Sequence, residues 1–266
     1  MILSGRDLKP GLEEKLNSLL LGKNLSFYIY SDSQNLPAQS YLRGVKKMLD
    51  RLSVPYKEGY IDKNKSKEEN MKIFMEESKG LYTVIGKPLG VDYEEEYINL
   101  LNPLFDPDMV TPINRAHLLE GDLDYLPAIA RSVKTIIEGY NIDVTGRKVL
   151  IIGRSLSVGL PISRYFISKN ALVEIGHSKV PSSKLNEEAS LADLIVLASG
   201  HQGVIKRESL NKNSIVIDCG YSADGGDLGF VPEENEIKAY TPVPGGTGVL
   251  TSLCLLYNAI LLTSKH

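Results

Sequence analysis

One short segment limits the folds open to this chain more than any other feature. Residues 148–152 are typical of a buried strand, Gly153 ends it, and a tight turn leads into a helix expected over 157–168. Such a strand, turn and helix N-terminus form the phosphate site of dinucleotide-binding folds, because helix N–H groups and the helix dipole hold the pyrophosphate. The spacing departs from G-x-G-x-x-G, since Ser155 takes the second glycine position and Gly159 follows one residue late. The segment indicates either a dinucleotide site or an ordinary strand–turn–helix of an α/β domain.

The strand expected over 171–176 bears on which dinucleotide would bind. NAD-binding folds place an Asp or Glu at the end of this strand, where it accepts a hydrogen bond from the ribose 2′-hydroxyl. Here Glu174 lies earlier, within the strand. The strand end itself carries polar and basic residues, His177, Ser178 and Lys179. With Arg154 in the first loop, this pattern favours a 2′-phosphate, and therefore NADP over NAD; a solvated loop histidine is the alternative for His177.

Composition and charge exclude several classes of function. The 266 residues suffice for two modest domains, and a net charge of −3 gives no basic surface for nucleic acid or an anionic membrane. No apolar run reaches the roughly 18 residues of a spanning helix, and the first residues lack the apolar core of a signal peptide. Cys219 and Cys254 lie in apolar segments, and the cysteines and histidines show no metal-ligand spacing. We expect buried free thiols, a cytoplasmic location and no metal.

Strands alternate with helices along the whole chain, which predicts an α/β fold with parallel sheets and crossover helices. In the first part we expect helices over 8–22, 39–52 and 66–79, strands over 25–30, 56–60 and 82–85, and loops over 31–37 and 102–108. In the second part we expect a helix over 128–140, strands over 148–152, 171–176, 194–200 and 214–220, and a terminal helix over 249–263. The last two strands of that series end in glycine, as strands facing a ligand crevice often do.

Several motifs occur together in a fixed order. They are Gly153-Arg154-Ser155-x-x-Val158-Gly159-x-Pro161, His177-Ser178-Lys179, Ile217-Asp218-Cys219-Gly220, and Thr241-Pro242-Val243-Pro244-Gly245-Gly246-x-Gly248. Gln39-Ser40-Tyr41 at the start of a lysine-bearing helix and Asp106-x-Asp108 after an Asn-Pro complete the set. Over nearly the whole chain this series resembles the methylenetetrahydrofolate dehydrogenase/cyclohydrolase family.

The resemblance implies a homodimer of two-domain α/β subunits, each with a cleft between its domains. It implies a folate-binding domain over 1–124 plus 245–266, to which the terminal helix returns, and a Rossmann-type NADP-binding domain over 125–244. The implied reaction is NADP-dependent oxidation of 5,10-methylenetetrahydrofolate to the 5,10-methenyl form. In bifunctional members, hydrolysis to 10-formyltetrahydrofolate follows in the same cleft.

The resemblance also assigns roles to individual residues. Tyr41 would stack on the folate, and Asp108 would hold the amide and amino edge of the pterin. Pro244 and Gly245 would shape the cleft. The cofactor would be held by loop residues, of which Arg154 and Ser178 contact the 2′-phosphate: Gly153, Arg154, Ser155, Val158, Gly159, His177, Ser178, Gly220 and Tyr221. For Asp106 and Asp108 the alternative is an Asp-Pro turn in which Asp106 acts as a cap.

Two positions depart from the family pattern where proton transfer occurs. The family has a lysine four residues after the tyrosine, and here that residue is Val45. Lys46 is adjacent, but one step along a helix turns the side chain by about 100°. The family glutamine before Pro-Leu-Pro corresponds to Gly86, which leaves space. Lys87 either reaches into this space with its ammonium group or is a surface lysine of the loop. Lys46 and Lys87 are therefore the candidate proton-handling groups, because hydrolysis needs general acid–base catalysis that valine cannot provide.

These departures leave several interpretations open. The favoured one is an NADP-dependent dehydrogenase that retains the cyclohydrolase step. The alternatives are a dehydrogenase without that step, a catalytically silent NADP- or folate-binding paralogue, and an NADP dehydrogenase for another small substrate. The residues do not decide which group replaces the family lysine and glutamine, or whether the folate carries a polyglutamate tail or a modified carrier.

Overall fold

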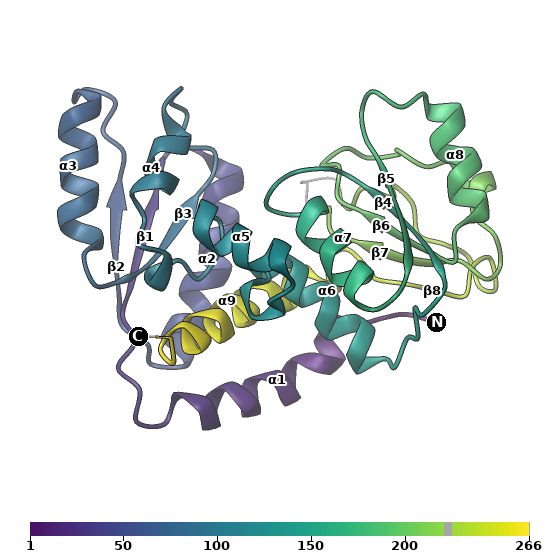
Figure 1. Ribbon diagram of the computed structural model, residues 1–266, viewed down its shortest axis with the longest axis horizontal. Helices are drawn as coiled ribbons and strands as arrows, with labels where there is room; N and C mark the ends of the chain where they lie inside the picture. Colours follow the sequence, from purple (N-terminus) through teal and green to yellow (C-terminus); the bar gives the residue numbers. More distant parts are fainter. Residues whose placement is uncertain (221–224, 266) are drawn as a thin grey trace.

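The computed structural model describes residues 1–220 and 225–265, and this part contains two parallel β-sheets (Figure 1). The smaller sheet has the order β2-β1-β3, with strands β1 (Phe27–Ser31), β2 (Tyr56–Tyr60) and β3 (Tyr82–Gly86) and connecting helices α2 (Leu36–Arg51) and α3 (Lys67–Ser78). All residues of β1 and β3 are buried, whereas the edge strand β2 is largely exposed. The predicted α/β class with parallel strands is confirmed.

The start of α2 differs from the sequence prediction. Asn35 accepts a hydrogen bond from the Ala38 N–H at 3.1 Å, and Pro37 occupies the first turn of the helix. An asparagine cap followed by proline is a strong helix start, because the cap satisfies a free N–H and proline already has the helical φ. The predicted loop over 31–37 therefore extends too far, because the helix already begins at Leu36. Tyr41 lies in the second turn of this helix.

Short elements that hydrophobic periodicity does not predict link the smaller sheet to the second part of the chain. They are α4 (Glu94–Leu100), η1 (Pro103–Phe105), α5 (Pro112–Glu120) and η2 (Leu123–Tyr125). Local signals do mark α5: the Thr111 side chain accepts a hydrogen bond from Asn114 N at its start, and Gly121 ends it in the left-handed conformation with φ 110°. Asp106 and Asp108 lie in the tight connection between η1 and α5.

The larger sheet has the order β5-β4-β6-β7-β8, and all of its pairs are parallel. Its strands are β4 (Lys148–Ile152), β5 (Leu172–Gly176), β6 (Leu194–Leu197), β7 (Ile215–Asp218) and β8 (Ala239–Tyr240), and its helical segments are α6 (Ala128–Gly139), α7 (Gly159–Ser168), α8 (Ser182–Leu191) and η3 (Arg207–Ser209). From β4 the chain passes to β5 on one side of β4, and it then returns to form β6 on the other side of β4. Strand order reverses at β4, and ligands of open α/β sheets bind at this kind of switch point.

The two ends of the chain join the two sheets. Residues before α1 (Gly5–Leu20) run beside β8, where the Leu3 N–H donates to the Tyr240 carbonyl at 2.7 Å. The terminal helix α9 (Gly248–Leu262) packs against α1, α2 and α6, and Figure 1 shows it passing below the smaller sheet toward the C-terminus. The terminal helix thus returns to the first part of the chain, as predicted.

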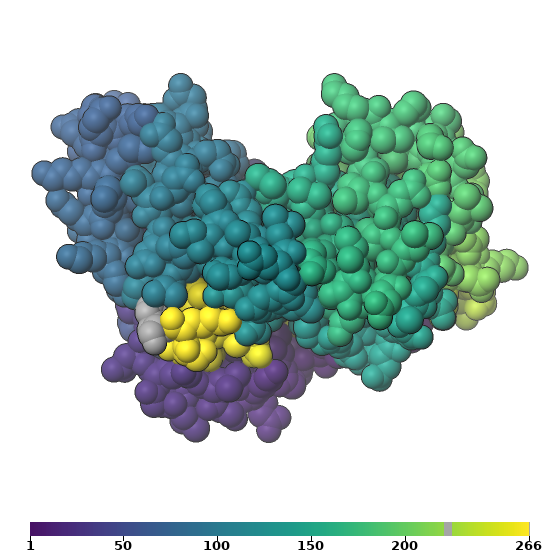
Figure 2. All heavy atoms as spheres, in the orientation of Figure 1, coloured from purple at the N-terminus to yellow at the C-terminus, as the bar shows by residue number. Residues whose placement is uncertain are grey.

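A continuous cluster of buried apolar side chains connects both parts of the molecule. It extends from Phe27 and Leu42 near the smaller sheet, through Leu253 of α9, to Val149 and Ile151 of the larger sheet. Above this shared core the molecule divides into a first lobe around the smaller sheet and a second lobe around the larger one, with a notch between them (Figure 2). In the part of the chain that the structure describes, no helix has the length and apolarity needed to cross a membrane.

Candidate active site

A pocket of about 550 Å³ lies between the two lobes. Its first-lobe wall includes one face of α2, the end of β3 and Asp108. The opposite wall includes Ser157, Val158, Gly220, the loop over 242–247 and the first turn of α9. Lys87 follows β3, Ser157 follows β4 and Gly220 follows β7. The pocket therefore collects the carboxyl ends of strands from both sheets, which is where α/β proteins bind their ligands.

Tyr41 and Asp108 meet in this pocket. The Tyr41 hydroxyl donates to Asp108 Oδ1 at 3.4 Å. Burial raises the pKa of Asp108 to about 7 and the negative charge of Asp106 adds to this, while the Tyr41 bond and the charge of Lys87 act in the opposite direction. Burial, followed by the charge of Asp108, also holds the pKa of Tyr41 well above its usual value. A carboxyl group that titrates near neutrality thus faces the pocket.

Asp106 has a different environment, although it is only two residues away. It is completely buried, and its Oδ2 accepts hydrogen bonds from Thr111 N at 2.8 Å and Asn114 Nδ2 at 2.9 Å. Burial raises the pKa of this carboxyl as well. Asp106 thus fixes the turn before α5, as the Asp-Pro turn interpretation expects, whereas Asp108 is left to face the pocket.

The two candidate lysines are in different places. Lys87 lines the pocket, and its Nζ lies 3.3 Å from Glu95 and 3.8 Å from Glu94 on α4. Lys46 is not among the residues that line the pocket and instead pairs with Glu58 of β2 at 3.1 Å. The expectation for Lys46 is therefore wrong, because the turn of the helix directs its ammonium group toward β2.

The two departures from the family pattern are both filled with apolar atoms. Val45 is completely buried in the shared core, while its neighbour Gly44 lines the pocket. At Gly86, an added Cβ would lie 2.6 Å from Leu42 Cδ1. The expected space beside Gly86 is thus occupied by Leu42, and Lys87 reaches the pocket without passing through it.

The first loop of the second lobe is shaped by two required glycines. Gly153 has φ 137°, and a Cβ there would lie 2.1 Å from the Ala198 carbonyl oxygen. A Cβ at Gly159 would lie 2.0 Å from the Gly153 carbonyl oxygen, so the loop folds tightly onto itself where α7 begins. The Ser155 hydroxyl accepts a hydrogen bond from Val158 N at 3.1 Å. Only glycine permits this backbone approach, which is the requirement of a pyrophosphate loop.

The ends of β4 and β5 bring the predicted 2′-phosphate residues to one edge of the sheet. Ile152 pairs with Gly176, and the Gly153 N–H donates to the Gly176 carbonyl at 2.9 Å. Arg154 and Ser178, each two residues beyond that pair, are exposed. Next to Ser178, the His177 Nδ1 accepts a hydrogen bond from the backbone N–H of Lys179. Glu174 pairs with Lys148 at 3.1 Å within the sheet, away from the strand end.

Two aspartates, which the sequence analysis did not single out as functional, hold the backbone directly after β7. Asp218 Oδ1 accepts hydrogen bonds from the N–H groups of Gly220 at 2.8 Å and Asp227 at 3.0 Å. Asp227 in turn accepts from Ser199 N at the end of β6. A Cβ at Gly220 would lie 2.0 Å from Asp227 Oδ1, so this glycine is required. Tyr221, also predicted to contact the cofactor, lies outside the described residues.

The loop after β8 closes the pocket. Pro244 and Gly245 both line it, and Gly245 has φ 126°. The Gly5 N–H donates to the Gly245 carbonyl at 2.8 Å, and the Thr247 hydroxyl donates to the Asp218 carbonyl at 3.0 Å. The loop is thus fixed on one side to the start of α1 and on the other to the end of β7.

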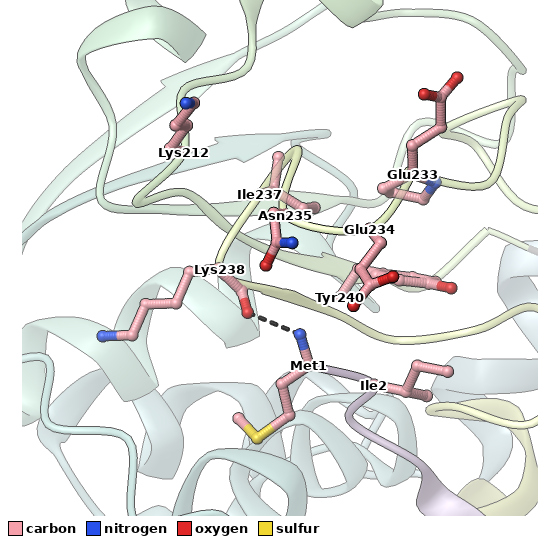
Figure 3. Close-up of a pocket in the computed structure, with 10 residues that line it drawn as sticks. Met1, Ile2, Lys212, Glu233, Glu234, Asn235, Ile237, Lys238 and Tyr240 are labelled. Carbon is pink, nitrogen blue, oxygen red and sulfur yellow. Dashed lines mark hydrogen bonds between the residues drawn. The ribbon is translucent and has the colours of Figure 1, made fainter.

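Figure 3 shows a second pocket, of about 590 Å³, whose described lining residues differ from those of this site. It is formed by the N-terminus and the segment leading into β8, and the Met1 amino group donates to the Lys238 carbonyl at 2.8 Å. None of the predicted site residues that the structure describes lines it.

The model of a known protein family matches the second part of the chain. Residues 127–266 match the model of the tetrahydrofolate dehydrogenase/cyclohydrolase NAD(P)-binding domain. The chain belongs to the tetrahydrofolate dehydrogenase/cyclohydrolase family. The matched part contains the two required glycines of the first loop, Gly220 after β7, and the loop after β8.

Relatives of this family match nearly the whole chain. The bifunctional protein FolD of Clostridium beijerinckii is 34% identical over 251 residues, which cover 92% of this chain and 85% of that protein. The structure of a bifunctional methylenetetrahydrofolate dehydrogenase/cyclohydrolase from Thermoplasma acidophilum is 26% identical, with a TM-score of 0.87 over 100% of this chain and 98% of that one. The Campylobacter jejuni FolD structure is 23% identical, with a TM-score of 0.90 over 100% and 99% of the two chains, and shows the shared fold.

Proposed function

We propose that the chain is an NADP-dependent methylenetetrahydrofolate dehydrogenase. The observation that carries this proposal is the shared pocket, in which Tyr41 and Asp108 lie opposite Val158 and Gly220. Substrate and dinucleotide residues thus border one cavity, as direct transfer between two bound molecules requires. An NADP dehydrogenase acting on an unrelated small substrate would have no need for the Tyr41–Asp108 pair.

The residues present fit a dinucleotide. Gly153 and Gly159 let the first loop pack tightly against the backbone of Ala198 and onto itself where α7 begins, so backbone N–H groups and a helix N-terminus are available to a pyrophosphate. When bound, NADP accepts a hydride from the bridging carbon of the substrate. The chain's own residues bind and orient: Tyr41 offers a ring for stacking, and Asp108 holds the pterin edge. The methenyl product is cationic, so the ionised Asp108 stabilises it electrostatically.

The residues at the strand ends favour NADP over NAD. Arg154 and Ser178 follow paired positions at the ends of β4 and β5, and Lys179 adds a second positive charge. The carboxylate of Glu174 is tied to Lys148 within the sheet. The 2′-phosphate of a bound NADP would therefore meet a guanidinium and a hydroxyl at this edge of the sheet, and a charge-assisted contact of this kind is strong.

Cyclohydrolase activity is the second part of the proposal, with Lys87 as the proton-handling group. Lys87 lines the same pocket as Asp108, and its charge is close enough to lower the pKa of that carboxyl. The buried Val45 and the apolar contact of Gly86 with Leu42 favour the alternative, a dehydrogenase without the hydrolytic step.

One assay tests both parts. The purified chain is mixed with methylenetetrahydrofolate and NADP, and NADPH formation is followed separately from methenyl absorbance. Formation of NADPH supports the dehydrogenase, and its absence with tight NADP binding would indicate a silent binding protein. Methenyltetrahydrofolate that disappears only at its solution rate would show that the hydrolytic step is missing.

The family likeness also leads us to infer a homodimer in the cytoplasm. The two cysteines are free thiols, and burial raises the pKa of both, which fits a reducing compartment. Sedimentation at micromolar concentration tests the dimer, because a stable species near the 29.3 kDa of one chain would contradict it.

A further inference from the structure

A buried asparagine on the terminal helix contacts the segment that carries Asp108. Asn258 is completely buried, and its Nδ2 donates to the Pro107 carbonyl at 2.8 Å and to the Leu126 carbonyl at 3.0 Å. Pro107 directly precedes Asp108, and Leu126 lies between η2 and α6, where the chain passes from the first lobe to the second. One side-chain amide thus joins the substrate segment to the connection between the lobes.

Arg131 fixes the orientation of that amide. Its Nε donates to Asn258 Oδ1, and its Nη2 donates to the Asp124 carbonyl at 2.7 Å. The guanidinium also lies over the Tyr257 ring, 5.1 Å from the centroid. Because arginine only donates hydrogen bonds, Asn258 must present its oxygen to Arg131 and its NH₂ group to the two carbonyls.

The other side of the same segment is held independently. Asp106 accepts from Thr111 N and Asn114 Nδ2, which fixes the turn before α5. The Asp106 carbonyl also accepts a hydrogen bond from Met109 N at 3.1 Å, so Asp106 closes a turn around Pro107 and Asp108. The Asn258 bond to the Pro107 carbonyl ties this turn to α9, and Asp108 is left facing the pocket. Without the Asn258 bonds, the turn would keep its internal bonds but lose this hydrogen bond to α9.

We propose that Asn258 is a positioning residue that sets the place of Asp108 in the pocket through the Pro107 carbonyl. The inference rests on the proposed function, in which Asp108 holds the pterin. Asn258 itself does not line the pocket, so its effect on catalysis passes entirely through the backbone it holds. A displacement of about 1 Å at a reacting site is enough to lower the rate by about a hundredfold.

The chain offers a matched control in Asn70. It is also buried, at 2% exposure, and its Nδ2 donates to the carbonyls of Asp62, Lys65 and Ser66 at 2.9, 3.3 and 3.0 Å. Its contacts lie at the start of α3, and it does not line the pocket. Asn70 therefore has the same chemistry as Asn258 without a connection to Asp108.

The test compares Asn258→Asp with Asn70→Asp, because both changes keep side-chain size and replace an NH₂ donor by oxygen. In Asn258→Asp one carboxylate oxygen keeps the Arg131 contact, while the other faces two carbonyls that it repels. We expect kcat/KM for methylenetetrahydrofolate to fall roughly tenfold to a hundredfold, with the Kd for NADP within about twofold of wild type and the acid limb of the pH profile shifted. Asn70→Asp should lower the unfolding midpoint but leave kcat/KM and the acid limb unchanged.

Each outcome decides the proposal. Equal folate kinetics and pH profiles in the two variants would overturn it, because Asn258 would then only stabilise the fold. If Asn258→Asp does not fold, Asn258→Ser is measured in its place against Asn70→Ser. If the wild-type chain does not oxidise methylenetetrahydrofolate, the proposed function fails, and calorimetric binding of tetrahydrofolate to the same variants decides. Weaker binding only in the Asn258 variant supports the positioning role, and equal or absent binding overturns it.

Discussion

Replacing Asp108 by asparagine should change both the stability profile and folate binding. The folded-state pKa of Asp108 is about 7, against an ordinary value of 3.8. Each pKa unit corresponds to about 1.4 kcal/mol, so a fully buried carboxyl with this pKa would change the free energy of unfolding by about 4 kcal/mol between low and high pH. Because Asp108 borders an open pocket, solvent screening reduces this to about 2 kcal/mol.

The sign of the effect follows from the raised pKa. The folded protein holds its proton at pH values where the unfolded chain has already lost it, so this contribution to stability is complete below about pH 4 and lost as the pH rises to about 7. Between about pH 5 and about pH 8, wild type should therefore lose about 1–2 kcal/mol more unfolding free energy than Asp108→Asn. Urea denaturation of both proteins at several pH values measures this difference.

Folate kinetics provide the functional side of the same experiment. The Asp108→Asn side chain is a neutral amide with a single acceptor oxygen, so the folate KM should rise or turnover should cease, while the Kd for NADP stays close to wild type. The acid limb of kcat/KM near neutrality should also disappear from any residual activity. Parallel stability profiles would show that Asp108 titrates normally and that the burial argument is wrong. Unchanged folate kinetics would make Asp108 only a turn residue.

Three further substitutions test the other walls of the pocket. Arg154→Ala removes a charge-assisted contact of roughly 1.5–3 kcal/mol, so NADP affinity should fall about tenfold to a hundredfold while NAD affinity changes little in titrations; equal losses would refute the assignment. Lys87→Met should slow methenyl hydrolysis by roughly two to four orders of magnitude and the dehydrogenase much less. Lys46→Met is its matched control, and identical rates for both variants would exclude Lys87. Gly159→Ala places a Cβ against the Gly153 carbonyl, so we expect about 1–3 kcal/mol of destabilisation and weaker NADP binding, and an unaltered melting curve would contradict the required-glycine argument.

Much of the fold follows from short-range signals in the sequence. Continuous apolar runs such as 149–152 and 194–197 indicate buried parallel strands, and the terminal apolar helix indicates a core position. Such patterns fail for α4 and α5, which are too short to show a helical period. The start of α2 was missed for another reason, since its signal lies in the Asn35–Pro37 cap and not in the apolar residues.

The parts of the site that depend on backbone shape could be predicted from the sequence. The parts that depend on how side chains pack between distant elements could be predicted less well. Gly153 and Gly159 are required by carbonyl contacts that any loop of this kind must make. The prediction that Lys46 faces the pocket was wrong, because the pairing of its ammonium group with Glu58 depends on how α2 lies against β2. The space expected at Gly86 is filled by Leu42, a contact between distant parts of the chain that no local pattern encodes.

The three places where the chain crosses between the lobes limit how the notch can open. The first crossing follows Leu3, which pairs with β8, the second lies at Leu126, and the third is the loop after β8. The first and third are joined by the bond from Gly5 to Gly245, and the second is held by Asn258. Two connections that are bonded to each other, and a third that is held by a side chain, restrict how one lobe can twist or slide against the other. We therefore expect the lobes to move by hinge bending at these connections, and removing either lobe would cut all three of them.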